Sequence, residues 1–171
     1  MMGDLSQIAT SNLAFIVGVV LCFVFIKSYR FIAKKQFNKF KLRLYRYVIA
    51  NYTSIDKEEF ILGECRWNHK CHYNSIQAIK EDKASKVLMC YVMIDNQIFL
   101  HYINQDNKGK YIDNTFGWRF EHAEYYFIRE IVSSEYKLLP SYITTLNNAH
   151  IKLLGRIPFR QYCIKEQNNN K

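Results

Sequence analysis

The 171 residues are 49% apolar and 23% charged, with only six Gly and two Pro, which excludes a disordered or low-complexity chain and fits one domain. The net charge is +9, but eight cations lie between residues 27 and 46, where there is no acidic residue, and residues 47 to 171 are nearly balanced. Because a nucleic-acid-binding domain spreads its cations over a folded face, this distribution argues against a nucleic-acid partner.

The N-terminal segment, residues 1 to 26, has no charge between residues 5 and 26. As a helix, that stretch would reach about 33 Å, enough to cross the roughly 30 Å hydrocarbon layer of a membrane. The alternatives are a buried core helix and a cleaved signal peptide. A signal peptide carries its positive charge before the apolar run, whereas here the charge follows it. We therefore expect a single transmembrane helix.

The basic stretch at residues 27 to 50 indicates the orientation of that helix. The positive-inside rule places the N-terminus outside and the rest of the chain in the cytoplasm, at the inner (plasma) membrane. Apolar residues interleaved with the cations predict a juxtamembrane helix that contacts anionic membrane lipids, with a solvated spacer helix as the alternative. The residues expected at the membrane surface are Lys27, Arg30, Lys34, Lys35, Lys39, Lys41, Arg43 and Arg46.

Residues 51 to 166 are expected to form one cytoplasmic α+β domain, followed by a disordered tail at residues 167 to 171. Turn-forming residues predict an irregular segment at residues 51 to 70. Helical spacing of apolar residues then predicts a helix over residues 71 to 83, with Asn68 as its N-cap.

Strands are expected in the middle of the domain. The run at residues 86 to 94 is apolar on both faces, as a central strand must be. A tight turn leads to a strand at residues 97 to 104, and a polar loop leads to another at residues 110 to 115. Two helices are predicted after these strands, at residues 121 to 137 and 141 to 154.

This order of elements brings together Cys71 at a helix start, His101 in a strand and Asp113 in the next strand. If a five-residue loop joins the strands, Asn104 pairs with Lys110, and His101 lies directly opposite Asp113. A helix packed on that face would bring the Cys71 sulfur to the imidazole. The helix N-terminus and the imidazolium would favour the thiolate, and the carboxylate would orient the ring.

Neighbouring residues complete the predicted site. The backbone N–H of Cys71 would stabilise an oxyanion, and Asn68 could supply or shape the second donor. His72 and Asn74 are expected to cap or support the start of the helix. Five cysteines without regular spacing indicate a reducing compartment, and the heavy use of Asn, Ile, Lys, Tyr and Phe is typical of AT-rich bacterial or phage genomes.

The strings CHYNS, FLHYIN and GKYIDNTFGW resemble the papain-like superfamily of cysteine hydrolases, in its transglutaminase-like branch. Cys71, His101 and Asp113 match that family's order of nucleophile, base and carboxylate over residues 64 to 118. The resemblance implies a papain/transglutaminase-like α+β fold, with a small antiparallel sheet packed by helices. It also implies amide cleavage, deamidation or transamidation through a Cys71 thioester, without a cofactor or metal. Because the membrane anchor would confine the domain to the membrane surface, we expect a protein substrate or partner near the membrane.

Two alternatives lead away from catalysis. One is a non-catalytic, membrane-tethered interaction or inhibitor module on the same fold, since a fold does not guarantee its chemistry. The other is a zinc-stabilised membrane protein, because four possible zinc ligands lie close together in the sequence: Cys65, His69, Cys71 and His72.

Overall fold

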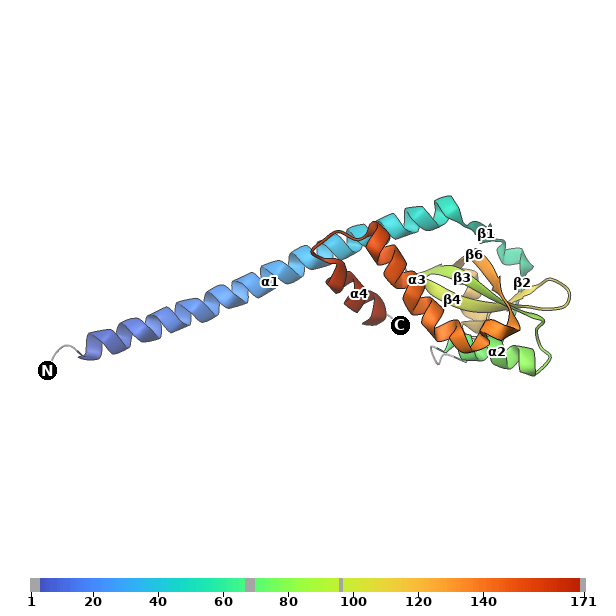
Figure 1. Ribbon diagram of the computed structural model, residues 1–171, viewed down its shortest axis with the longest axis horizontal. Coiled ribbons are helices and arrows are strands. Elements are labelled where there is room, and N and C mark those ends of the chain that lie inside the picture. The colour runs from blue at the N-terminus through green and yellow to red at the C-terminus, as the bar shows by residue number, and fades with distance from the viewer. Residues whose placement is uncertain (1–3, 67–69, 96, 170–171) are drawn as a thin grey trace.

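The computed structural model describes residues 4–66, 70–95 and 97–169, and it consists of a long N-terminal helix and an α+β domain (Figure 1). Helix α1 (Asp4–Asn51) is continuous over 48 residues. No Pro interrupts this part of the sequence, which explains why the apolar and the basic segments share one helix.

The N-terminal part of α1 is not covered by the rest of the chain. Its apolar side chains are exposed from residue 15 to residue 26, and Phe15 and Phe25 are 74% and 72% exposed. An 18-residue window of the helix has a mean hydropathy of 2.0, and none of it is buried. The helix is therefore long and apolar enough to cross a membrane, and a contiguous apolar surface of this kind marks an interaction site.

The second half of α1 packs on the domain. Residues spaced three or four apart on one helix face are buried against it, along α3 and α4: Ala33, Phe37, Phe40, Leu44 and Val48. The same spacing defines the core-facing stripe of an amphipathic helix. Residues 27 to 50 therefore contribute to the core of the domain, and the alternative of a solvated spacer helix is wrong.

Two of the cations expected at the membrane surface contact the protein instead. The Nη1 atom of Arg43 donates to the carbonyl of Leu154 at 2.6 Å. The Nζ atom of Lys41 lies 5.4 Å from the ring centroid of Phe37. The other six are exposed, namely Lys27, Arg30, Lys34, Lys35, Lys39 and Arg46.

Replacing Phe40 by Ala should lower the free energy of unfolding by about 3–5 kcal/mol, because the buried ring would leave a cavity between α1 and the sheet. Leu42 provides the matched control, since it is 51% exposed on the same helix and Leu42→Ala should cost less than about 0.5 kcal/mol. Urea unfolding of the detergent-solubilised protein, followed by aromatic circular dichroism, measures both. Equal effects would contradict the packing of α1 on the domain.

The domain is built on a curled, mixed six-stranded sheet with the order β1-β6-β3-β4-β5-β2. Neighbouring strands are antiparallel except β5 and β2, which are parallel. The predicted strands at residues 86 to 94 and 97 to 104 are confirmed. The strands are β1 (Thr53–Ile55), β2 (Phe60–Ile61), β3 (Lys86–Ile94), β4 (Gln97–Gln105), β5 (Tyr111–Ile112) and β6 (Glu124–Ile131).

Three further helices complete the α+β architecture: α2 (Cys71–Lys80), α3 (Leu139–Leu154) and α4 (Arg160–Asn169). Helix α2 begins at the predicted residue, but its N-cap is Lys70, without a side-chain capping bond. Asn68, the predicted cap, lies outside the described residues. Helix α4 includes residues 167 to 169, which were predicted to belong to a disordered tail; residues 170 and 171 also lie outside the described part.

Two secondary-structure predictions are wrong. The helix predicted at residues 121 to 137 is strand β6, flanked by the 3-10 helices Gly117–His122 and Ser133–Leu138. Its aromatic and β-branched residues suit a strand beside β3, and this pairing partner is not visible in local sequence. The segment at residues 51 to 70, predicted to be irregular, contains β1, β2 and the 3-10 helix Lys57–Glu59.

The sheet buries both faces, and strand alternation separates two clusters. One face packs under the helices through residues that include Val87, Met89, Tyr91, Leu100 and Tyr102. The other face is closed by the curled ends of the sheet and by loops, and includes Leu88, Cys90, Val92, Ile103 and Tyr125. Helix α2 belongs to the first cluster, because Cys71, Ile76 and Ile79 pack there.

Candidate active site

His101 and Asp113 form a buried pair. The Nε2 atom of His101 lies 2.9 Å from the Oδ2 atom of Asp113, and the two residues are 2% and 0% exposed. His101 is paired with Cys90 in β3, so its ring lies on the face away from the helices. The predicted proximity of imidazole and carboxylate is thus present in the structure.

The register that creates this pair differs from the predicted one. Asn104 pairs with Ile112 instead of Lys110, a shift of two residues. An even shift keeps each side chain on its own face, which is why the contact survives. Strand β5 ends at Ile112, however, so Asp113 reaches His101 from the turn that follows the strand and not from a position directly opposite.

The Asp113 carboxylate accepts four hydrogen bonds. Its Oδ1 atom accepts from the backbone N–H groups of Thr115 (2.8 Å) and Phe116 (2.9 Å). Its Oδ2 atom accepts from the hydroxyl of Tyr125 at 2.7 Å as well as from His101. Burial would raise the pKa of this carboxyl, but the His101 ring and the hydrogen bonds hold it below the ordinary value.

Two glycines allow the turn after Asp113 to lie close to residues 63 to 65. A Cβ atom on Gly63 would lie 2.6 Å from the Asp113 carbonyl oxygen. Gly117 has φ +54°, and a Cβ atom there would lie 2.6 Å from the Cβ of Cys65. Only residues without a side chain fit at these two positions, so the backbone around Asp113 is fixed by close contact.

The His101 ring lies close enough to the Cys71 thiol for its charge and hydrogen bonding to lower the pKa of the thiol. Because Nε2 of His101 is bonded to Asp113, Nδ1 is the ring atom left to face the sulfur. The sulfur also accepts from the backbone N–H of Tyr102 and from the side chain of His72. Cys71, His101 and Asp113 are therefore connected in the order that the sequence predicts.

The route by which α2 reaches the imidazole differs from the expected one. Helix α2 packs on the face opposite to His101, so it does not cover the His101 and Asp113 pair. Strand β5 pairs only with Asn104 and Gln105 of β4, which leaves the edge of β4 near Tyr102 outside the sheet ladder among the described residues. Because both the backbone N–H of Tyr102 and the His101 ring lower the pKa of the thiol, we infer that the sulfur lies at this edge of β4.

The electrostatics of this arrangement favour an ion pair. Burial would raise the pKa of the Cys71 thiol, but the His101 charge and the hydrogen bonds from His101, His72 and Tyr102 lower it to about 6. Burial would lower the pKa of His101, but Asp113 and the thiolate raise it to about 10. Both shifts favour a thiolate on Cys71 and an imidazolium on His101 near neutral pH.

The other described cysteines with shifted pKa values behave in the opposite way. Burial and the nearby Asp113 charge raise the pKa of Cys90 well above the ordinary value, and burial raises that of Cys163. Thiol reactivity depends on the thiolate fraction. Cys71 is therefore distinguished chemically from both, although all three are buried.

Aromatic rings hold the imidazole in place. Phe116 stacks on His101, with ring centroids 4.7 Å apart and an interplanar angle of 12°. Phe99 approaches the same ring edge-on, at 6.3 Å. These contacts and the Tyr125 hydroxyl were missed from the sequence. Tyr125 lies in the segment for which the sequence predicts a helix. Its aromatic and β-branched neighbours are the signal for strand β6, and that strand would have placed Tyr125 near the centre of the sheet.

Cys71 and His101 line a cavity of about 360 Å³. Most of its wall is apolar, and an ion pair between Arg119 and Asp95 at 2.9 Å also contributes to the lining. The apolar lining residues are Ile94, Phe99, Leu100, Phe116, Pro140 and Ile143. A thiol of lowered pKa beside a cavity whose wall is mostly apolar, with polar side chains such as His72, Gln97 and Thr115 also in its lining, is the arrangement expected of a substrate site.

No protein-family model, curated protein or solved structure matches this chain. The chemistry of the site therefore follows from its own geometry. A thiol of lowered pKa lies beside a hydrogen-bonded imidazole and buried carboxylate at the wall of a cavity, which is the arrangement needed for nucleophilic catalysis with general acid and base assistance.

Of the three predicted supporting residues, two lie close to the triad residues in the structure. His72 lines the cavity and bonds the thiol. Asn74 is fully buried, and its Nδ2 atom donates to Oγ1 of Thr115 at 3.0 Å, which ties α2 to the turn that carries Asp113. Asn68, the predicted oxyanion donor, lies outside the described residues.

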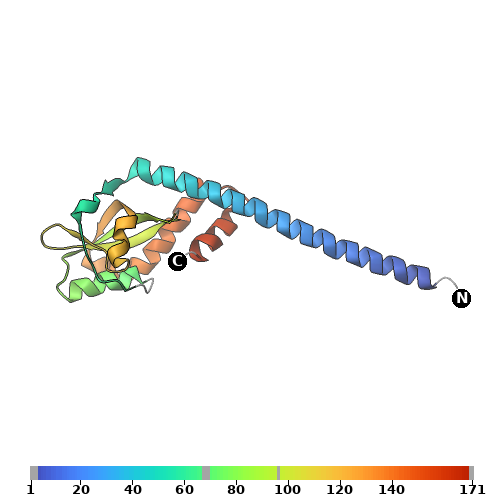
Figure 2. The ribbon, with the colours of Figure 1, turned by 180° about the vertical axis from the view of Figure 1, so that it is seen from behind.

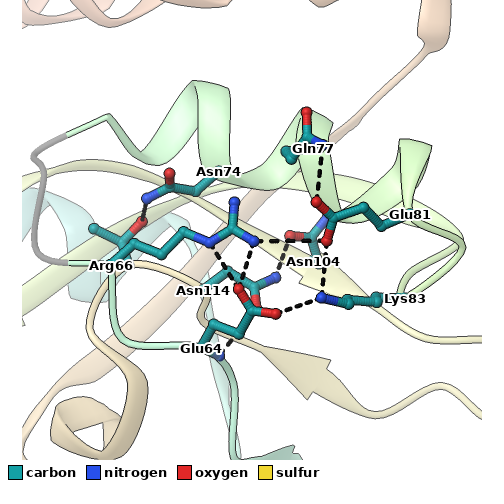
Figure 3. Close-up of polar contacts among 9 residues, drawn as sticks. Glu64, Arg66, Asn74, Gln77, Glu81, Lys83, Asn104 and Asn114 are labelled. Atoms are coloured by element: carbon teal, nitrogen blue, oxygen red, sulfur yellow. Dashed lines mark hydrogen bonds and ion pairs between the residues drawn. The ribbon is translucent and has the colours of Figure 1, made fainter.

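A polar network fixes α2 against the sheet, as Figure 3 shows. Asn104 donates to the carbonyls of Ser75 (3.0 Å) and Lys86 (3.1 Å) and accepts from Asn114 at 3.0 Å. Near the C-terminal end of α2, ion pairs link Glu64 and Glu81 with Arg66 and Lys83 (Figure 3). The buried amides position the helix more strongly than the exposed ion pairs, which are worth little individually.

The zinc alternative gains no support from the described residues. Within them, no three His, Cys, Asp or Glu side chains converge to hold a metal ion. Cys65 instead donates to the carbonyl of Phe116 at 3.5 Å, and hydrogen bonding from His72 lowers the pKa of the Cys71 thiol. His69, the fourth predicted ligand, lies outside the described residues.

Proposed function

We propose that the protein is a membrane-anchored, cytoplasmic cysteine-dependent amide hydrolase or acyltransferase on a papain/transglutaminase-like domain. The observation that carries this proposal is the Cys71 thiol, with its pKa lowered by His101, beside the hydrogen-bonded pair of His101 and Asp113 at a cavity wall. A purely structural cysteine has no need of an imidazolium, and burial alone would raise its pKa.

In the first step, the Cys71 thiolate attacks the carbonyl carbon of an amide and forms a C–S bond. The carbonyl electron pair moves to oxygen and then returns as the C–N bond breaks. The imidazolium of His101 gives its proton to the departing amine, which leaves a Cys71 thioester and a neutral ring. Asp113 keeps the ring oriented and stabilises its positive charge.

In the second step, neutral His101 takes a proton from water or from an acceptor amine, and the oxygen or nitrogen attacks the thioester. Release of the thiolate yields a carboxylic acid or a new amide, and the starting protonation states return. Backbone N–H groups in the first turn of α2, Cys71 included, have no partner within the helix and suit the oxyanion, and the His72 side chain lies beside the thiol.

The apolar cavity favours an acyl group that carries an apolar side chain or lies in an apolar segment of a protein. The end of α2 that carries Cys71 faces the same side of the domain as the N-terminal half of α1 (Figures 1 and 2). With α1 crossing the inner membrane, N-terminus outside, this end faces the bilayer. A protein substrate close to the membrane, or anchored in it, would meet the thiol there.

Trapping of the acyl-enzyme tests this proposal. Full-length protein in its native membrane should acquire a hydroxylamine-sensitive acyl group on Cys71, and substrate proteins should show new termini, deamidated Gln or new cross-links by mass spectrometry. Cys71→Ala should lose all of these products. Cys65→Ala is the matched control, because Cys65 is exposed and outside the thiol and imidazole pair. Products that persist in Cys71→Ala would leave the non-catalytic interaction module as the function.

A further inference from the structure

The connection between α3 and α4, residues 155 to 159, lies beside the end of the apolar part of α1. The ring of Phe159 packs on Tyr29 of α1, with centroids 5.9 Å apart. Tyr29 follows Ile26, the last residue of the uncharged stretch, by about 4.5 Å along the helix axis. Among the segments of the domain, this connection lies farthest along α1 toward its N-terminal end (Figures 1 and 2).

The surface of this connection is apolar and basic. Ile157 is 73% exposed and Leu153, in the last turn of α3, is 65% exposed. Lys152 and Arg156 are exposed next to them, and α1 presents the exposed cations Lys27 and Arg30 at the same level. Arg160 closes the connection by donating to the carbonyls of Gly155 (3.3 Å) and Lys152 (3.0 Å).

We propose that residues 155 to 159 form a second membrane contact, in which Ile157 enters the interface of the bilayer crossed by α1 and Arg156 binds anionic headgroups. Apolar side chains flanked by cations suit the boundary between acyl chains and phosphates. The occupant is the bilayer because the connection continues directly from the apolar helix surface. This proposal rests on the membrane span of α1 that the proposed function includes, and it does not depend on catalysis.

A second membrane contact would restrain the orientation of the domain, which a single transmembrane helix leaves free. A single transmembrane helix can rotate about its axis and tilt, which would swing an attached domain over the membrane. A second contact on the domain restrains both movements and holds the Cys71 end of α2 toward the bilayer. The packed stripe from Ala33 to Val48 makes α1 and the domain one unit, so the restraint is transmitted to the cavity.

Tryptophan quenching in nanodiscs tests the proposal on the full-length protein. Ile157→Trp, Leu62→Trp and Phe25→Trp are compared after the emission of the unsubstituted protein is subtracted. Leu62 is the matched control, since it is 70% exposed and directly follows β2, which lies at the far end of the domain (Figure 1). Phe25 reports on the span itself.

With brominated phosphatidylglycerol and phosphatidylcholine, emission of Ile157→Trp and Phe25→Trp should fall by about half or more relative to ordinary lipids, and that of Leu62→Trp should not change. Adding Arg156→Gln should weaken the quenching of Ile157→Trp only. Quenching of Phe25→Trp without quenching of Ile157→Trp overturns the second contact and leaves the span intact. Equal quenching at positions 157 and 62 overturns it as well, and no quenching at position 25 overturns the span.

Discussion

In a His101→Ala variant, the pH midpoint for alkylation of Cys71 should move from about 6 to above the ordinary thiol value of 9.0. The substitution removes the positive ring and its hydrogen bond, which lower the pKa of the thiol. It leaves burial, the largest influence, which raises the pKa, against the smaller hydrogen bonds from His72 and Tyr102, which lower it. The pH midpoint is measured instead of the alkylation rate at one pH. A thiolate of higher pKa is also more nucleophilic, and this partly offsets the effect of its lower population on the rate. Iodoacetamide labelling, quantified at the Cys71 peptide across pH, measures the midpoint.

In the unsubstituted protein, the rate of acyl transfer should first rise and then fall as the pH increases. Activity should rise through about pH 6, as Cys71 loses its proton, and fall through about pH 10, as His101 loses the proton needed by the leaving amine. Alkylation needs only the thiolate, so it should rise through pH 6 and keep its rate at pH 10. A single alkylation midpoint near 9, the same in both proteins, would contradict the ion pair.

His72→Ala separates the two histidines. His72 contributes one hydrogen bond to the sulfur, whereas His101 contributes both a charge and a hydrogen bond. The midpoint in His72→Ala should therefore move up by less than in His101→Ala. An equal or larger movement would assign the imidazolium role to His72 instead.

Replacement of Asp113 by Ala should lower the free energy of unfolding by about 3–5 kcal/mol, since it leaves the buried His101 ring without its counter-charge and the Tyr125 hydroxyl without its acceptor. Asp113→Asn keeps an oxygen for the turn N–H groups but removes the charge. Its acyl transfer should fall by as much as about 10⁴-fold, with a smaller loss of stability.

Asp82→Asn is the control for both measurements, because Asp82 is exposed and remote from the site, and its positive φ of 55° is tolerated by Asn. It should change stability by less than about 0.5 kcal/mol and leave the reaction unchanged. Urea unfolding and the yield of the Cys71 thioester report the two effects. If Asp113→Asn retained full acyl transfer, the carboxylate would have no part in orienting His101.

The order of the candidate triad residues could be predicted from the sequence, but the way in which they meet could not. The order of Cys71, His101 and Asp113 and the start of α2 followed from local spacing. The register of β4 and β5 did not, because the predicted pairing was wrong by two residues, and the contact survived only because side chains alternate with a period of two. The Asp113 turn and the short β5 replaced the expected cross-strand pair.

Local residue patterns were enough to predict the uncharged apolar helix, the basic segment after it, strands β3 and β4, and helices α2 and α3, because each of these follows from the spacing of neighbouring residues. Only the folded chain shows that residues 124 to 131 form a strand, that one face of residues 33 to 48 joins the core, and that Tyr125 donates to Asp113 while Phe116 stacks on His101. The approach of the thiol to the imidazole at the edge of β4 is likewise a feature of the folded chain. These features depend on contacts between distant residues, whose energies outweigh local preference.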